Sequence, residues 1–201
     1  GAAGMVNALK DDIKEAVAET SDELMDKFFS GEEFTQEEIR KGLLQGVRSG
    51  AIAPVFCGSA ITTEAINPLL NAIVTILPSA ADNAGEQVKT PGGEELYLDC
   101  RAEDPLAAFV FKTVADPFVG KMSYVKVVAG KLTTASTPTN VRAGVPERMG
   151  KIVTIRGKKQ EDTDGIAAGD IGVVCKLAEA VTGDSLCDPK RLVLFEKAPF
   201  P

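Results

Sequence analysis

Residues 115–132 read "ADPFVGKMSYVKVVAGKL", and this stretch decides the fold. The turn residues Asp116-Pro117 stand between two runs rich in β-branched and aromatic side chains, 106–115 and 122–129. Such side chains favour strands, whereas Asp-Pro favours a turn. The stretch therefore predicts two short strands joined by a tight connection.

The same texture continues through the C-terminal half of the chain. Further short strands are predicted over residues 96–100, 137–142, 149–156, 171–178 and 191–195, with glycine-containing turns between them. Roughly regular spacing of short strands is typical of a closed barrel or a sandwich. With only about 100 residues, a small barrel filled by its own side chains is favoured over one that encloses a ligand cavity. We therefore predict an antiparallel β-barrel over residues 95–201.

The first 50 residues read as helices. Apolar side chains recur every three or four residues between Val6 and Thr20. The pairs Thr20/Glu23 and Thr35/Glu38 have the spacing of capping boxes, which predicts that helices begin there. Residues 1–4, ahead of the first methionine, are interpreted as a leftover linker.

A different pattern follows. Residues 51–57 are apolar on both faces and contain Pro54, which predicts an edge strand of a parallel sheet. Residues 67–77 predict a helix that begins with Asn-Pro and ends at Pro78. Residues 79–94 are small, polar and rich in glycine and proline, and they are interpreted as an interdomain linker.

Composition excludes several classes of function. The chain has no histidine, which removes Ser-His and Cys-His nucleophile pairs and imidazole metal ligands. The four cysteines have no paired spacing, so packed, reduced thiols are favoured over a disulfide framework or a zinc site. No apolar run is long enough to cross a membrane, and no signal peptide is recognisable, which favours the cytoplasm.

Charge is distributed unevenly. The net charge of the chain is −7, yet residues 121–160 carry nine basic side chains and a single acid, Glu147. A cationic segment in an acidic protein suggests a polyanionic partner. The alternative is a solvated face whose acidic partners come from elsewhere in the fold.

Five stretches, taken together and in order, carry a resemblance. "VFCGSA" (55–60) resembles the fifth signature motif of GTPases, and "INPLLNAIVTILPS" (66–79) resembles the last helix of the GTPase domain of bacterial elongation factor G. The stretch 115–132, with "AGDIGVVCKL" (168–177) and "TGDSLCDP" (182–189), is similar to that family's second domain. The resemblance implies an α+β, multi-domain chain. Residues 5–78 would be the helical and αβ end of a P-loop GTPase domain, and residues 95–201 a translation-factor-type antiparallel β-barrel.

The resemblance implies a guanine contact at Gly58, Ser59 and Ala60, whose small size would let a purine approach the backbone. A tight αβ turn with no ligand is the alternative. No Gly-Lys-Ser/Thr phosphate loop and no Asn-Lys-X-Asp motif occurs in the sequence. GTP or GDP with Mg²⁺ is therefore expected only in an intact parent GTPase. In this fragment we expect no catalytic residue, no metal ligand, no cofactor and no GTP hydrolysis.

In the family the second domain lies against small-subunit ribosomal RNA, so the ribosome is the expected partner, with no DNA and no membrane. The RNA-contact candidates are Arg142, Arg148, Lys151, Arg156, Lys158 and Lys159. Translocation during elongation is the leading function. A ribosomal protection or recycling paralogue and a free-standing binding barrel are the alternatives. Apolar surface left uncovered over residues 5–78 further predicts self-association or non-native packing, and Phe118 is either a core side chain or an exposed one.

Overall fold

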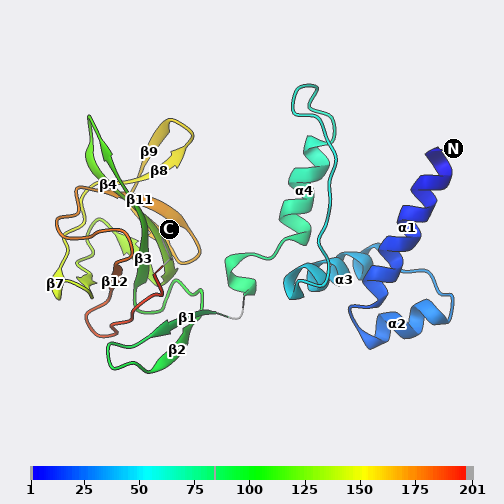
Figure 1. The fold of residues 1–201 in the computed structure, drawn as a ribbon, viewed down its shortest axis with the longest axis horizontal. Helices are drawn as coiled ribbons and strands as arrows, with labels where there is room; N and C mark the ends of the chain where they lie inside the picture. Colours follow the sequence, from blue (N-terminus) through cyan, green and yellow to red (C-terminus); the bar gives the residue numbers. More distant parts are fainter. Residues whose placement is uncertain (1, 84, 198–201) are drawn as a thin grey trace. The chain divides into compact units, whose positions relative to one another are not determined.

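The computed structural model describes residues 2–83 and 85–197. The chain divides into two compact units, Gly1–Ser79 and Ala80–Pro201. We call them the helical unit and the barrel unit, and each is described by itself (Figure 1). The combination of helices with a large antiparallel sheet confirms the predicted α+β class.

The helical unit is built from α-helices whose ends are set by local sequence. They are α1 (Ala2–Ala18), α2 (Asp22–Phe29), α3 (Gln36–Ser49) and α4 (Ile66–Ile76). Thr35 and Glu38 form the predicted capping box at the start of α3, and Gly50 ends that helix in the left-handed conformation. The cap of α2 is Ser21 rather than Thr20, because the Thr20 hydroxyl donates to the Val17 carbonyl instead.

A small core joins α1, α2 and α3. Val17, Ala18 and Phe34 are buried, and half-buried apolar side chains of α2 and α3 pack against them. Gly42 of α3 faces Val17 so closely that a Cβ atom there would lie 2.7 Å from a Val17 methyl group. The absence of a side chain at Gly42 therefore allows α1 and α3 to approach each other.

Two predictions for this unit are wrong. Residues 51–57 form an irregular segment rather than a strand, and Val55 is 87% exposed. A strand needs a neighbour for its backbone N–H and C=O groups, and within residues 2–83 and 85–197 none pairs with this segment. Helix α1 begins at Ala2, so most of the supposed linker 1–4 is helical, while Gly1 lies outside the described residues.

Helix α4 also begins earlier than predicted. Its cap position is Ala65, which has a left-handed backbone (φ 60°) and makes no side-chain cap hydrogen bond. Pro68 therefore lies inside the first turn of the helix, where its missing N–H costs nothing.

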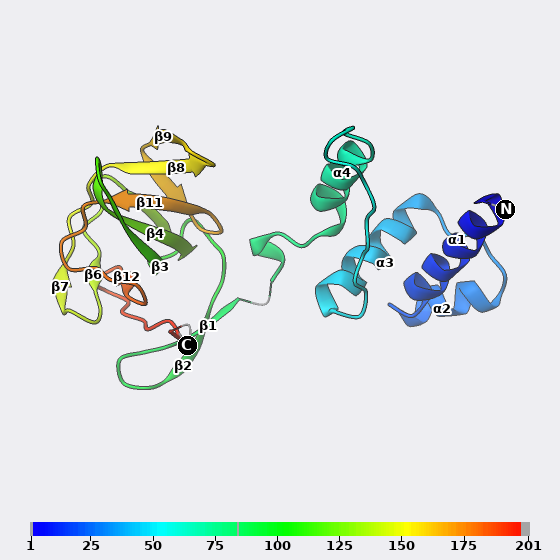
Figure 2. The same ribbon diagram turned by 45° about the horizontal axis from the view of Figure 1, so that its top comes forward.

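The body of the barrel unit consists of two antiparallel sheets. In the described residues, the larger sheet has the strand order β7-β6-β12-β3-β4-β11-β8-β9, and β5 pairs with β10 separately. Figure 2 shows β3, β4, β11 and β8 side by side. The strand bounds are β3 (Ala107–Asp116), β4 (Gly120–Ala129), β5 (Lys131–Thr133), β6 (Thr139–Asn140), β7 (Val145–Pro146), β8 (Ile152–Arg156), β9 (Lys159–Thr163), β10 (Gly165–Ala167), β11 (Ile171–Cys175) and β12 (Ser185–Cys187).

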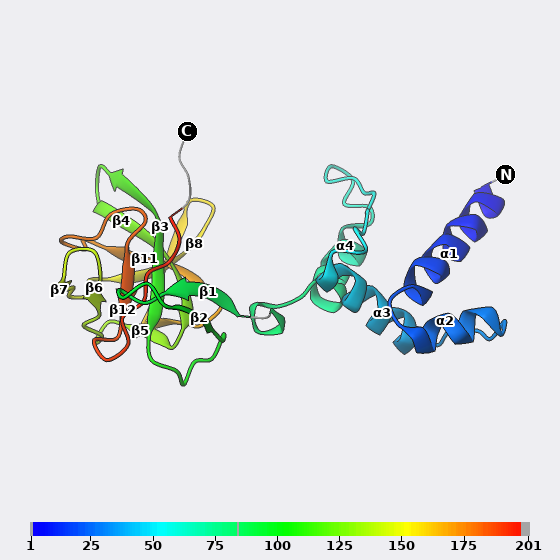
Figure 3. The ribbon, with the colours of Figure 1, turned by 60° about the horizontal axis from the view of Figure 1, so that its bottom comes forward.

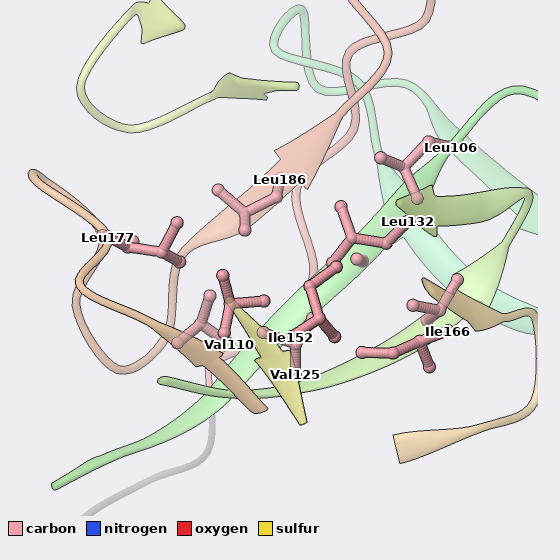
Figure 4. Close-up of a cluster of buried hydrophobic side chains, with 12 residues drawn as sticks. Leu106, Val110, Val125, Leu132, Ile152, Ile166, Leu177 and Leu186 are labelled. Carbon is pink, nitrogen blue, oxygen red and sulfur yellow. The ribbon is translucent and has the colours of Figure 1, made fainter. Parts of the chain in front are cut away.

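The main core lies between these two sheets. Val125 and Val110 come from the large sheet, and Leu132 and Ile166 come from β5 and β10 (Figure 4). All four are buried. Since one cluster joins both sheets, the strands enclose their own side chains, as expected for a small barrel.

The predicted linker 79–94 is wrong as well. Within it, a 3₁₀ turn occupies Ala80–Asp82, and β1 (Glu86–Lys89) pairs with β2 (Glu95–Leu98) (Figure 3). The glycine- and proline-rich residues 90–94 are the hairpin turn, in which Gly93 has a positive φ of 90°. The composition correctly indicated a turn, but buried Val88 ties the hairpin to the barrel core.

The last predicted strand, 191–195, forms only one isolated bridge, from Leu194 to Lys89. Strand β9 was not predicted because its sequence, Lys-Gln-Glu-Asp-Thr, is polar. It lies at the end of the sheet order and pairs only with β8 among the described strands. Charged side chains are common on such edges, since they discourage pairing with another chain.

Candidate functional site

The predicted guanine-contact loop is a tight, internally bonded turn. The Ser59 amide donates to the Glu64 carbonyl (3.0 Å), and the Thr62 amide donates to the Ser59 hydroxyl (3.2 Å). Thr63 and Ala65 adopt left-handed backbone angles, with φ 59° and 60°. Non-glycine residues rarely adopt this region, and such residues gather at functional sites.

This geometry leaves part of the loop backbone open. Gly58 and Ala60 are exposed, and no hydrogen bond of their amides to any described residue is found. The Ser59 amide is already used within the turn. A Cβ atom at Gly58 would lie 3.0 Å from the Glu64 carbonyl oxygen, so a larger residue would disturb the turn. Two free amides suit the carbonyl oxygen of a base, and this guanine contact stays a prediction.

The structure separates Arg142 from the other candidate RNA contacts. Its guanidinium donates two hydrogen bonds to the buried Asp184 carboxylate, from Nε to Oδ1 (2.6 Å) and from Nη2 to Oδ2 (3.0 Å). It also donates to the Glu179 carbonyl oxygen (3.0 Å). The hydrogen bonds and the charge of Asp184 raise the pKa of Arg142. Arg142 therefore holds the fold together, and its guanidinium is already engaged.

Asp184 is the centre of this buried polar group. It also accepts from the Asn140 side-chain amide (2.9 Å) and from the Val181 amide (3.0 Å). Burial by itself raises the pKa of Asp184, but the hydrogen bonds from Arg142, Val181 and Asn140 outweigh burial, so the pKa lies below its usual value.

The β8–β9 hairpin brings four of the candidates together. Lys151 pairs with Asp162 (2.7 Å), whereas Arg156 and Lys159 both pair with Glu161 (2.9 Å each). All three basic side chains remain at least 60% exposed. Exposed ion pairs contribute little to stability, so a phosphate can replace the carboxylate at small cost.

Lys158 lies in the β8–β9 turn, and Arg148 precedes β8. Both side chains are exposed, and neither forms an ion pair with any described residue. The hydrogen bonds of Lys159 and Arg156 lower the pKa of Glu161, which therefore stays ionised at neutral pH. The hairpin thus presents four cations against two acids, and the lysine at its turn, Lys158, forms no ion pair with a described residue.

Two structural residues were missed from the sequence. Glu147, the single acid of the basic segment, is buried, and its carboxylate accepts the amides of Ala178, Glu179 and Ala180. Asp184, although part of the stretch "TGDSLCDP", received no role. The isolation of Glu147 among nine basic residues was a signal that could have marked it as unusual.

Phe118, left open by the sequence, is 96% exposed at the tip of the β3–β4 hairpin. Cys175 and Cys187 are buried in the barrel, and burial raises the pKa of Cys187 to about 11. Within residues 2–83 and 85–197, no cluster of three metal-ligating side chains is present. No helix of the described chain is long and apolar enough to cross a membrane.

Comparison with known proteins finds similarity for the barrel unit and for the chain as a whole. Residues 105–189, which run from just before β3 to just beyond β12, match the family model of elongation factor G domain 2. A crystal structure of a protein from Thermus thermophilus is similar over 98% of this chain, with 27% sequence identity and a TM-score of 0.76. The chain spans only 28% of the length of that Thermus protein. The barrel unit therefore contains a domain of the translation elongation factor type.

Proposed function

We propose that this chain is part of an elongation-factor-G-like ribosomal GTPase that acts in translocation during translation elongation, in the cytoplasm. The observation that carries the proposal is the match of residues 105–189 to elongation factor G domain 2. The β8–β9 hairpin supports it, because its four cations are exposed and its ion pairs are exchangeable.

In this proposal the barrel unit docks on small-subunit ribosomal RNA through Lys151, Arg156, Lys158 and Lys159. Arg148 is the nearest further candidate in sequence, while Arg142 is a weaker candidate than the hairpin residues because its Nε and Nη2 are bonded to Asp184. Each phosphate contact makes log K fall by about 0.7 to 0.9 for each tenfold rise in salt. Binding to small subunits should therefore weaken steeply as salt increases.

The helical unit contributes the guanine-side loop in the longer protein. When GTP or GDP with Mg²⁺ is bound there, the open amides of Gly58 and Ala60 fit the carbonyl oxygen of the base. The sequence contains no Gly-Lys-Ser/Thr motif of the kind that forms a phosphate loop. A single hydrogen bond contributes only about 1 kcal/mol. Titration calorimetry of this chain with GDP should accordingly give no measurable heat of binding.

Cosedimentation with small ribosomal subunits tests the docking proposal. The double variant Lys158→Glu/Lys159→Glu should reduce binding and flatten its salt dependence by about 1 to 2 log units per decade. The matched control Lys89→Glu/Lys190→Glu makes the same charge change on exposed side chains elsewhere in the barrel unit and should retain binding. If both double variants lose binding equally, the effect is one of net charge and the hairpin is not the docking site. If the wild-type chain fails to sediment with small subunits at low salt, the docking proposal is contradicted.

A further inference from the structure

The tip of the β3–β4 hairpin carries an exposed aromatic residue on a backbone that is held by hydrogen bonds. One carboxylate oxygen of Asp116 accepts the backbone amides of Phe118 and Val119, at 2.8 Å each. These two hydrogen bonds lower the pKa of Asp116, and the bond from Val119 has the larger effect. The tip is thus held by a charge-assisted turn, while the Phe118 ring stays 96% exposed.

The neighbour of Phe118 anchors the tip from below. Val119 packs against the buried side chains Met122, Val153 and Val173, which come from β4, β8 and β11. Ile155 of β8 packs against the same cluster. Phe118 therefore projects from an ordered turn whose next residue is fixed against β8.

Single exposed apolar residues are common on protein surfaces, so the surroundings of Phe118 decide its meaning. Of its neighbours along the chain, Pro117 is exposed, Val119 is half-buried against the barrel, and Gly120 and Lys121 follow at the start of β4. Because the Phe118 ring is almost fully exposed, a planar partner can reach its faces without entering a groove. This setting suits a flat, polar-edged ring better than an apolar protein surface, which requires a surrounding patch.

Lysines lie next to the tip. Lys121 lies at the start of β4, and its Nζ donates to the Ala178 carbonyl (3.4 Å). The Lys176 amide donates to the Lys121 carbonyl (2.7 Å), which joins the two lysine backbones. Lys176 has a positive φ of 60°, an unusual conformation for a residue with a side chain, and its side chain is exposed.

The positive charge continues toward β8. The Cys175 amide donates to the Lys151 carbonyl (2.9 Å), and Lys176 is the next residue along the chain. The backbones of Lys151 and Lys176 therefore lie close together at the end of β11. Lys151 precedes β8, whose hairpin with β9 carries the remaining exposed cations. An open aromatic ring beside cations is the arrangement that binds single-stranded nucleic acid.

We propose that Phe118 stacks on an unpaired base of RNA, and that Lys121 and Lys176 bind the phosphates beside that base. This inference rests on the proposed function and adds to it a contact that distinguishes unpaired from paired RNA. The β8–β9 hairpin supplies charge alone, whereas Phe118 supplies the preference for an accessible base.

The chain has no tryptophan, so Phe118→Trp places a single fluorescent reporter at the tip. The full chain is titrated with a short single-stranded oligoadenylate, with an RNA duplex of equal length, and with polyphosphate. Stacking predicts that the single strand quenches the tryptophan, while the duplex and polyphosphate do not. Equal quenching by polyphosphate would overturn the stacking contact.

Affinity measurements complete the test. Phe118→Ala should weaken binding of the single strand by about 5- to 100-fold, with duplex binding and the salt dependence unchanged, and Phe118→Tyr should retain binding. Since the ring is almost fully exposed, the melting temperature should not change. If the Phe118→Ala variant binds the single strand as tightly as the wild type, the stacking inference is overturned, but the proposed ribosome docking is not. If the wild-type chain binds none of the three probes, both the stacking inference and the proposed RNA docking are overturned.

Discussion

Replacement of Glu147 should destabilise the barrel unit more than any other single charge removal in the basic segment. Glu147 is 1% exposed, and its carboxylate is the acceptor for the amides of residues 178–180. These amides belong to the segment between β11 and β12, whose Leu177 and Ala180 are part of the main core. Glu147 therefore fastens that segment to the end of β7.

The size of the effect follows from the geometry. Oε1 accepts from Glu179 (2.8 Å) and Ala180 (2.6 Å), and Oε2 accepts from Ala178 (3.0 Å). Glu147→Gln keeps the shape but turns an amide N–H toward one of these donors and removes the charge, which should cost about 2 kcal/mol. Glu147→Ala leaves the buried Ala180 amide without a partner and opens a small cavity, which should cost about 3 to 4 kcal/mol.

Tyrosine fluorescence during urea unfolding measures this free energy. Both tyrosines, Tyr97 and Tyr124, lie in the barrel unit, so the signal follows that unit alone. For a unit of about 120 residues, a loss of 3 kcal/mol should lower Tm by roughly 12 °C.

Glu179→Gln is the matched control, because it removes the same charge from an exposed side chain within the segment that Glu147 holds, and it should change stability by less than about 0.5 kcal/mol. If Glu147→Gln unfolds at the same urea concentration as Glu179→Gln, the three amide bonds do not hold the loop, and the reasoning is refuted.

Three further predictions concern pH, packing and association. Because the pKa of Asp184 is lowered in the folded state, its contribution to stability is complete above about pH 5 and is lost as pH falls through about 4 and below. The free energy of unfolding of the barrel should therefore decline over that range, and less steeply in Asp184→Asn. Equal slopes in acid titrations of the wild type and the variant would contradict this. In Gly150→Ala the new Cβ atom would clash with the Cys175 carbonyl oxygen, so this variant should destabilise the barrel by about 2 kcal/mol. The control Gly92→Ala, whose Cβ atom meets only ordinary contacts, should not be destabilised. Thermal unfolding of both variants measures the difference. Large apolar side chains are exposed over the helical unit, so sedimentation velocity should reveal concentration-dependent self-association, and a monomer at all concentrations with an ordered helical unit would disprove it.

Local signals in the sequence were sufficient for much of the fold. The capping box of Thr35 and Glu38, the left-handed end at Gly50 and the β3–β4 turn at Asp116 depend on neighbours within a few residues, so their patterns predicted them. The five stretches in order also led to the elongation factor resemblance, which the match over residues 105–189 supports.

Pairing and burial were decided only by the tertiary structure. Residues 51–57 look like a strand, yet a strand forms only when another supplies its hydrogen bonds, and none does so in the described chain. The same holds for charge: Arg142 and Lys158 are both basic residues of one segment, but only Arg142 meets a buried carboxylate, from a residue 42 positions away. Sequence identifies which side chains can ionise, whereas long-range contacts determine which of them are used inside the fold and which remain free for a partner.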